Sequence, residues 1–234
     1  MKEKVSCIIP VYNEEKRVLN VLNVVATHKL INEIIVVDDN SEDNTLKEIK
    51  DFIRANKPLI CSIKIIKKRG KRGKASSLYM GFNKARGDYL FMIDGDLKGL
   101  TSDNISELIL PVLCRKVDVG YSLRNTLFIH NLLGIDVITG EKIFHKNFFH
   151  NLPECRNTGF GIEVVFNEYF IKHHKKIGVV KWPNVTCYYK THKKGFVLGI
   201  MDSYKMMQDI FKIIPWYKFI YQTIYLAATS KKLN

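Results

Sequence analysis

Two carboxylates separated by one glycine end an apolar run in the first half of the chain. The run covers Tyr89 to Ile93 and is followed by Asp94, Gly95 and Asp96. A short apolar run bounded by turn residues is typical of a strand covered on both faces, as in a parallel sheet between helices. Ligands bind such sheets at the carboxyl ends of the strands, and carboxylates suit Mg²⁺ or Mn²⁺ that bridges a diphosphate. The triplet therefore predicts a metal and phosphate site, with an ordinary solvated turn as the alternative.

The elements that must position these carboxylates alternate between strands and helices. Runs of β-branched residues predict strands, and apolar residues at helical spacing predict helices between them. The predicted strands are Val5–Val11, Ile34–Val37, Ser62–Ile66 and the run that ends at Asp94, and the predicted helices are the segment from Glu14, Asp43–Asn56 and Ala75–Ala85. This alternation indicates βαβ units, right-handed crossovers and a parallel sheet with helices on both faces.

Polar residues follow the successive strands, and a parallel sheet brings such positions to one edge. They are Tyr12, Asn13, Glu14, Asp38, Asp39, Lys74, Asp94 and Asp96. Their convergence makes a binding site a stronger prediction than any single motif does.

No Gly-x-Gly-x-x-Gly follows the first strand, which argues against a dinucleotide fold. The loop Gly70–Lys74 has the wrong glycine spacing for a P-loop, and Ala75 stands where a Ser or Thr should bind magnesium.

Composition sets wider limits. The chain has 234 residues, 46% of them hydrophobic and 26% charged, which indicates a globular protein of one large domain or two small ones. Its net charge of +14 favours polyanionic partners such as nucleotides, anionic lipid or nucleic acid, without choosing among them. The cysteines lie far apart with no Cys-x-x-Cys spacing, so a reducing cytoplasm is the simpler interpretation; they are Cys7, Cys61, Cys114, Cys155 and Cys187.

Four motifs in order and spacing resemble the family 2 glycosyltransferases, including the dolichyl-phosphate mannose synthase group. They are Ile8–Glu14, Ile34–Asp43, Gly73–Ala75 with Gly81, and Ala85–Tyr89 running into Asp94-Gly95-Asp96. The resemblance covers the first half strongly and the second half loosely. It implies a GT-A type fold, with a nucleotide-sugar-binding half at 1–97, an acceptor half at 98–210 and a C-terminal tail at 211–234. Lys98 departs from the polyprenyl-phosphate branch, where a Gln commonly stands, and no transmembrane pair is evident.

The resemblance also implies roles for particular residues. Those that would line the nucleoside pocket are Pro10, Tyr12, Glu14 and Asp39. Lys74 would face the diphosphate, and Asp94 and Asp96 would hold a Mg²⁺ or Mn²⁺ complex of the nucleotide, with Asp96 as the more direct ligand. The alternatives are a helix cap for Tyr12 and Glu14, and a solvated loop charge for Lys74.

The acceptor half offers fewer signals. A strand is predicted at Val117–Tyr121, and Arg124 after it resembles a family arginine that contacts phosphate, with an ordinary surface arginine as the alternative. Thr139-Gly140 resembles a segment on the acceptor side. Glu163 opens a predicted helix and is the candidate general base for a hydroxyl acceptor. Two other roles for Glu163 stay open: a favourable charge near the helix dipole, or positioning of a phosphate acceptor that needs no base.

Two further features concern metal and membrane. His192 resembles a late histidine that completes the metal shell in some members, and a surface histidine among lysines is the alternative. The tail from Phe211 to Thr229 is apolar but interrupted, which predicts a helix lying on a membrane or on the protein, not one that spans. Its aromatic and neighbouring apolar residues suit an interface; they are Trp216, Tyr217, Phe219, Ile220 and Tyr221.

The sequence thus predicts a metal-dependent, inverting glycosyltransferase at the cytoplasmic face of a membrane. It would move a hexose from a UDP- or GDP-sugar to a polyprenyl phosphate or glycolipid. The alternatives are transfer to a soluble phosphorylated or sugar acceptor, and a noncatalytic protein that binds a nucleotide-sugar or polyanion. Nucleic acid is not expected as a partner, because no nucleic-acid module accompanies the basic loop at Lys67–Lys74.

Overall fold

The computed structural model describes residues 3–56, 58, 60–70, 72–124, 128–152, 161–187 and 207–233. The first half alternates between strands and helices as predicted. Its elements are β1 (Val5–Val11), α1 (Val18–Val25), β2 (Glu33–Asp38), α2 (Thr45–Ala55), β3 (Ser62–Lys67), α3 (Lys74–Lys84) and β4 (Tyr89–Met92). The helix predicted from Glu14 begins at Val18, because the backbone N–H of Glu14 donates to Thr45 Oγ1 at 2.8 Å and a turn intervenes.

The second half is less regular. Its elements are β5 (Leu97–Lys98), α4 (Ser102–Leu113), β6 (Val119–Arg124), α5 (Phe128–Leu133), β7 (Lys142–His145), α6 (Lys146–His150), α7 (Ile162–Lys172), β8 (Ile177–Trp182), β9 (Thr186–Cys187), α10 (Trp216–Thr229) and β10 (Lys231–Lys232). The strand predicted at Val117–Tyr121 runs instead from Val119 to Arg124, so it reaches further toward the polar edge.

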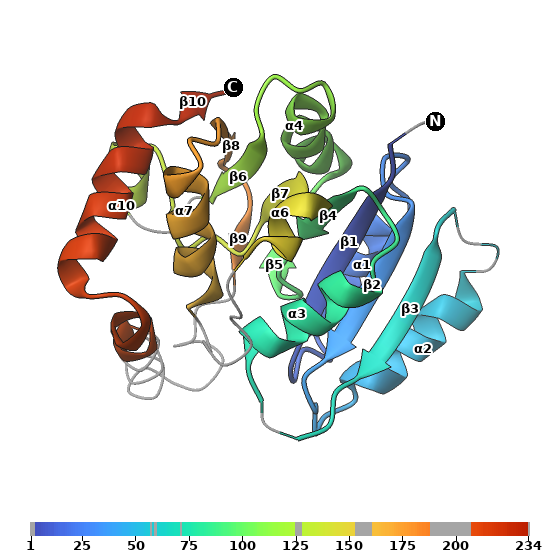
Figure 1. The fold of residues 1–234 in the computed structure, drawn as a ribbon. Helices are drawn as coiled ribbons and strands as arrows, with labels where there is room; N and C mark the ends of the chain where they lie inside the picture. The colour runs from blue at the N-terminus through green and yellow to red at the C-terminus, as the bar shows by residue number, and fades with distance from the viewer. Residues whose placement is uncertain are drawn as a thin grey trace.

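An eight-stranded sheet joins the two halves, in the order β10-β8-β6-β7-β4-β1-β2-β3 (Figure 1). All its pairings are parallel except those of β7, which runs antiparallel to both β4 and β6. The prediction of a mainly parallel sheet is therefore confirmed. Because β7 reverses direction between β4 and β6, the loop before β7 returns the chain to the edge where β4 ends. This return places Gly140 beside Asp94.

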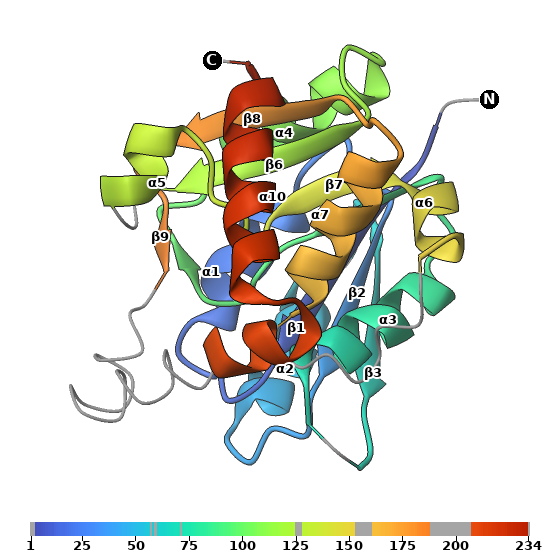
Figure 2. The same ribbon diagram turned by 60° about the vertical axis from the view of Figure 1, so that its left-hand side comes forward.

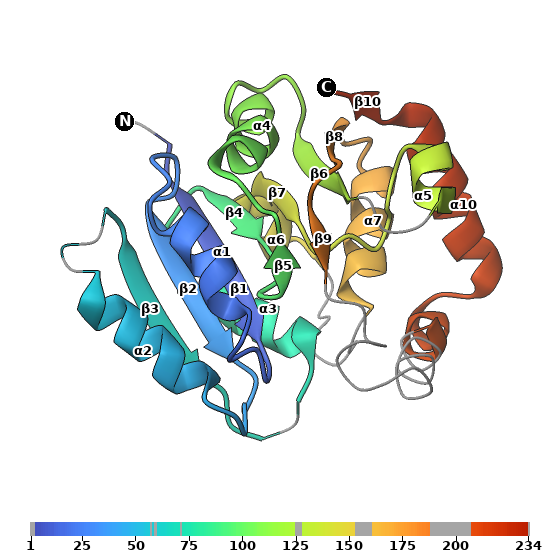
Figure 3. The ribbon, with the colours of Figure 1, turned by 180° about the vertical axis from the view of Figure 1, so that it is seen from behind.

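Helices cover both faces of the sheet. On one face α1, α2 and α4 enclose a core around Cys7, Ile9 and Val36 (Figure 3). On the other face α3, α6, α7 and α10 pack over Ile8 and Ile35. Successive residues of β1 thus point into opposite cores, which is why Cys7, Ile8 and Ile9 are all apolar.

The tail packs on the protein. α10 lies along α7 on the outer face of the second half (Figure 2), and β10 after it pairs with β8. Leu226 of α10 is 1% exposed and belongs to the same core as α7. Within the described residues, no helix is long and apolar enough to cross a membrane. The predicted helix is therefore packed, and its orientation is set by the contacts with α7.

Candidate functional site

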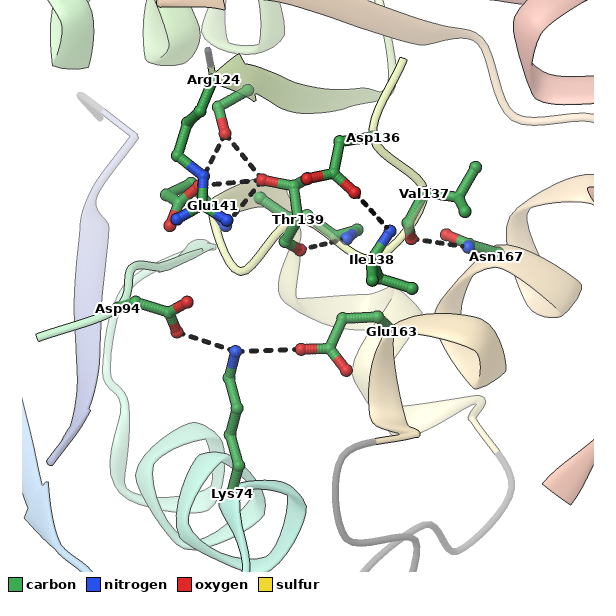
Figure 4. A network of polar contacts seen from close by, with 12 residues as sticks. Lys74, Asp94, Arg124, Asp136, Val137, Ile138, Thr139, Glu141, Glu163 and Asn167 are labelled. Carbon is green, nitrogen blue, oxygen red and sulfur yellow. Dashed lines mark hydrogen bonds and ion pairs between the residues drawn. The ribbon is translucent and has the colours of Figure 1, made fainter. Parts of the chain in front are cut away.

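Lys74 joins two acidic side chains that come from opposite halves of the chain. Its ammonium Nζ lies 2.7 Å from Asp94 Oδ1 and 3.0 Å from Glu163 Oε1 (Figure 4). Lys74 is the first residue of α3, Asp94 follows β4, and Glu163 lies in the first turn of α7. The side chains of Lys74 and Asp94 are 18% and 23% exposed, whereas that of Glu163 is only 4% exposed. The bridge thus lies where the carboxyl end of β4 meets solvent.

Charge pairing keeps Lys74 protonated. Burial alone would lower the pKa of Lys74, but the adjacent carboxylates of Asp94 and Glu163 raise it above its ordinary value. One cation then faces two acids, so the cluster carries a net negative charge when both acids are ionised. Such a cluster can attract a further cation.

Asp94 and Asp96 fit a divalent cation. Both side chains are half-buried directly after β4, and their oxygens are the hard ligands that Mg²⁺ and Mn²⁺ prefer. The positively charged ammonium of Lys74 lies next to Asp94 Oδ1, so this oxygen already pairs with a cation. Among the described residues no three His, Cys, Asp or Glu side chains form a metal cluster, so diphosphate oxygens and water would supply the other ligands. His192, predicted as a metal ligand, lies outside the described residues.

Gly140 provides the space in which the Asp94 carboxylate sits. A Cβ atom built on Gly140 would overlap with both carboxylate oxygens of Asp94. The backbone of the loop before β7 is thus packed directly on the candidate metal ligand. Gly140 therefore positions the Asp94 side chain, and the Thr139-Gly140 segment, predicted on the acceptor side, lies against Asp94.

Replacing Gly140 with alanine is expected to displace Asp94 and weaken Mn²⁺-dependent nucleotide binding by roughly tenfold or more, as loss of a supporting contact does at metal sites. Calorimetric titration with and without Mn²⁺ measures this. Gly81→Ala is the matched control, because its Cβ would meet Ile8 and Val37 in the core instead. The control should lower stability and leave the Mn²⁺ effect intact. Equal Mn²⁺ dependence in Gly140→Ala and the wild type would contradict the assigned role.

Arg124 forms a buried ion pair behind this loop. Its Nε lies 3.2 Å from Glu141 Oε2, with side chains 9% and 0% exposed. Ser122 Oγ and Thr139 Oγ1 donate to the same carboxylate oxygen at 2.7 and 2.8 Å. Burial raises the pKa of Glu141, and Arg124 opposes that rise. The alternative of a surface arginine is wrong, because β6 extends to Arg124 and carries it into the interior. Its Nη1 makes no hydrogen bond within the described structure.

Lys142 is a fully buried lysine that was not predicted as a site residue. Its Nζ donates to the backbone oxygen of Thr139 at 2.5 Å and lies 4.4 Å from the centre of the Tyr121 ring. Tyr121 in turn donates to Asn167 Oδ1 at 2.6 Å. Burial lowers the pKa of Lys142 to about 8, against the opposing effect of Glu163 and other acids. In the sequence, Lys142 is marked only by its position directly before the apolar residues Ile143 and Phe144.

The pKa of Lys142 predicts a pH dependence of stability. Between about 8, its folded value, and 10.5, its ordinary value, the unfolded chain holds a proton that the folded chain has released. The free energy of unfolding should therefore rise with pH across this window, by about 3 kcal/mol from this group. Urea unfolding of the wild type and Lys142→Met across the window isolates the effect, because all other lysines are shared. Parallel pH profiles for the two proteins would refute it.

Asp39 is held by two donors at the other end of the site. Lys68 Nζ lies 2.6 Å from Asp39 Oδ1, and the backbone N–H of Gly73 donates to Oδ2 at 2.7 Å. Lys68 also donates to Ser76 Oγ at 2.5 Å. Asp39 thus connects the end of β2 to the start of α3, the helix that carries Lys74. The basic loop gave a sequence signal for Lys68, but the buried pairing with Asp39 was not predicted.

The other residues predicted to line a nucleoside pocket lie at the same edge. The guanidinium of Arg72 lies 4.5 Å from the centre of the Tyr12 ring and pairs with Glu42. Glu14 pairs with Arg17, and its backbone oxygen accepts from the N–H groups of Arg17 and Val18 at 2.9 Å. Pro10, which lies within β1, is half-buried. Glu14 therefore begins the turn that leads into α1.

These strand ends and helix starts define a GT-A type fold. Glucosyl-3-phosphoglycerate synthase from Mycobacterium tuberculosis, solved with Mn²⁺, UDP-glucose and phosphoglyceric acid, superposes with a TM-score of 0.69. The likeness covers 90% of this chain and 79% of that one at 18% identity. The same enzyme has been solved with Mg²⁺ and UDP, with a TM-score of 0.66.

Sequence comparison finds similarity in the first half of the chain. Residues 6–109 match the model of glycosyl transferase family 2. An undecaprenyl-phosphate 4-deoxy-4-formamido-L-arabinose transferase of Serratia proteamaculans is 32% identical over 129 residues, 53% of this chain and 37% of that protein. An uncharacterized glycosyltransferase of Synechocystis is 35% identical over 102 residues, 42% of this chain and 31% of that protein. The chain spans less than half the length of these curated relatives.

Proposed function

We propose that this protein is a metal-dependent, inverting glycosyltransferase. It transfers a hexose from a UDP- or GDP-sugar to a polyprenyl phosphate or a glycolipid at the cytoplasmic face of a membrane. The observation that carries the proposal is the bridge from Asp94 through Lys74 to Glu163, because it joins the strand end that would hold the donor to the helix that would face the acceptor.

On the donor side, Asp94 and Asp96 would hold Mg²⁺ or Mn²⁺, with His192 as the further ligand that the family resemblance implies. A bound cation would neutralise the charge that develops on the leaving diphosphate. Lys74 would supply a second positive charge near the same oxygens. Pro10, Tyr12, Glu14 and Asp39 would line the nucleoside pocket. Both Asp39 oxygens already accept hydrogen bonds, one from Lys68 and one from Gly73. Asp39 would therefore either give up one of these partners to bind the nucleoside, or hold Lys68 and Gly73 in place to contact it.

On the acceptor side, Glu163 would act as a general base or position the substrate, and Arg124 would contact a phosphate. Glu163 Oε2 is buried and makes no hydrogen bond within the described structure, so this oxygen has capacity to accept a proton or a donor group. For a hydroxyl acceptor Glu163 would remove the proton of the attacking oxygen. For a phosphate acceptor, already ionised at neutral pH, Glu163 would position substrate through Lys74. Arg124, held by Glu141, would present its Nη1 toward a phosphate after a local rearrangement.

The acceptor class is inferred from the relatives. Several matched proteins act on undecaprenyl phosphate by name, which favours a lipid phosphate. The solved neighbour binds a soluble phosphorylated acceptor, which keeps that alternative as the second candidate. Both acceptors carry a phosphate, and both suit a protein with a net charge of +14.

Calorimetric titration with UDP-glucose and GDP-mannose, with and without Mn²⁺, tests the donor half of the proposal. We expect one nucleotide-sugar to bind in a metal-dependent manner. Transfer of labelled sugar is then measured to undecaprenyl phosphate in detergent and to 3-phosphoglycerate without lipid, which separates the two acceptor classes. Binding with no transfer to either acceptor would favour the noncatalytic alternative, and no donor binding would refute the proposal.

A further inference from the structure

The exposed side of α10 forms an apolar surface. Its residues are spaced so that they share one side of the helix, and each is about half exposed or more. This surface, which we call the aromatic face, consists of Trp216, Tyr217, Ile220, Tyr221 and Ile224, which are 64%, 58%, 46%, 54% and 61% exposed. Large apolar side chains gathered on one face of a surface helix mark an interaction site.

The opposite side of α10 is fixed to the protein. Gln222 is fully buried, and its Nε2 donates to the backbone oxygen of Val164 at 3.3 Å and to Glu168 Oε2 at 3.0 Å. Leu226 fills the core over the sheet, and Phe219 is partly buried against the same core. Phe219, grouped with the interfacial residues by the sequence analysis, therefore points inward. A buried amide and a buried leucine fix the rotation of α10, so the aromatic face cannot turn into the core.

Lysines predominate among the charged residues of the C-terminal segment. The sequence from Ile210 to Asn234 contains four lysines and no acidic residue. Lys212 and Lys218 have side chains that are 73% and 49% exposed, and Lys231 and Lys232 are exposed at the end of α10. The acidic neighbours that face this segment are Asp209 and Glu168, which pair with Lys212 and Lys218 at 3.1 and 3.7 Å. Apolar and aromatic residues bordered by lysines are complementary to an anionic lipid surface.

The aromatic face begins beside the acceptor side of the site. Ile210 and Ile214 are buried against Val164, next to Glu163, and Phe219 packs against the same group. Trp216, the first residue of α10, follows Ile214 by two positions. Figure 2 shows α10 alongside α7, the helix whose first turn carries Glu163. A surface bound by the aromatic face would therefore be close to the place where an acceptor enters.

We propose that the aromatic face docks on an anionic lipid bilayer, with α10 lying parallel to the surface at the level of the headgroups. The choice of a lipid partner rests on the proposed function, since a lipid-linked acceptor would reach the site from the membrane. The Trp and Tyr rings suit the headgroup region because each has an apolar body and a polar group. The lysines bring the helix to the surface, and the apolar side chains hold it there.

Tryptophan fluorescence offers a readout local to α10. The chain has two tryptophans, and Trp182 is fully buried, so a change in emission on adding vesicles reports on Trp216. We expect a blue shift with vesicles that contain phosphatidylglycerol, little shift with pure phosphatidylcholine, and weakening by salt. Co-sedimentation gives the affinity. The triple variant Tyr217→Ser, Ile220→Ser and Ile224→Ser should lose roughly tenfold or more of it.

A matched triple variant controls for the loss of exposed apolar area. Ile60→Ser, Leu110→Ser and Leu132→Ser change residues that are 65%, 44% and 69% exposed elsewhere, and vesicle binding should be unchanged. Equal vesicle binding by the face variant and the wild type, or no binding by the wild type, would overturn the proposal. So would a dimer in sedimentation equilibrium that the face variant abolishes, because a second copy would then cover the face.

Donor binding, measured on the same samples, separates this proposal from the proposed function. None of the substituted residues belongs to the candidate site, so all variants should bind the nucleotide-sugar as the wild type does. Vesicle binding without donor binding would support the docking surface and refute the enzyme. Donor binding without vesicle binding would refute the docking surface and the membrane location, and would leave the donor half of the proposed function standing.

Discussion

Replacing Asp96 with alanine should nearly abolish metal-dependent binding of the nucleotide-sugar and its transfer. The Asp96 carboxylate, which lies between β4 and β5, would be lost as a ligand. A bound cation contributes several kcal/mol to the stabilisation of a leaving diphosphate, so a decrease of roughly 1,000-fold in kcat/KM is expected. Calorimetry with and without Mn²⁺ measures the binding component, and transfer of labelled sugar measures the rate. Asp96→Asn separates charge from shape, because the amide keeps the volume but loses the negative charge.

Asp103→Ala is the matched acidic control. Asp103 is exposed in the first turn of α4, away from the bridge, so its loss should change donor affinity little. Its removal from a helix N-terminus should cost about 0.5 kcal/mol of stability, which also calibrates the unfolding assay. If Asp96→Ala bound the Mn²⁺ nucleotide-sugar as tightly as Asp103→Ala does, Asp96 would not be a metal ligand.

Replacing Lys74 with methionine should produce the largest loss of stability among the site variants. Asp94 and the nearly buried Glu163 would face each other without the cation that lies 2.7 and 3.0 Å from them. Removal of one partner from a buried charge pair costs about 3 kcal/mol, because the remaining charge is left without compensation. Urea unfolding of the variant and the wild type at neutral pH measures this loss.

A double-mutant cycle tests whether the loss comes from the bridge. Lys74→Met combined with Glu163→Gln should be more stable than Lys74→Met alone, because the uncompensated buried charge is gone. If Lys74 faces the donor diphosphate as proposed, donor affinity should be low in Lys74→Met and in the double variant, since both lack its positive charge. Additive stability effects of the two substitutions would show that Lys74 and Glu163 do not interact. Recovery of full donor affinity in the double variant would assign Lys74 a structural role only.

The first half of the fold could be predicted because its signals are local. β-branched runs and helical periodicity gave the order of β1 to β4 and the helices between them, with boundaries within a few residues. The edge that gathers Tyr12, Asp39, Lys74 and Asp94 followed from the rule that parallel strands end together. The second half was less predictable because β7 runs antiparallel between β4 and β6, and no local signal specifies a neighbour so distant in sequence.

Side-chain partners at the site depended on contacts across the whole sheet. The sequence suggested Lys74 and Glu163 separately, but their contact follows from α3 and α7 lying on the same face of the sheet. The burial of Arg124 follows from the extension of β6, and the packing of Gly140 on Asp94 follows from the reversal at β7. None of these pairings has a sequence spacing that repeats with a helix or strand period.

By itself the sequence determined the class of fold, the strand ends that carry carboxylates and a tail rich in aromatic and basic residues. These properties are local, since a residue's neighbours along the chain set its strand or helix preference and its charge. Only the tertiary structure decided that Lys74 bridges Asp94 and Glu163, that Lys142 is buried, and that Phe219 points inward while Tyr217 points outward. The reason is physical: burial and ion pairing depend on which distant segments the sheet order places side by side, and that order is fixed by packing of the whole chain.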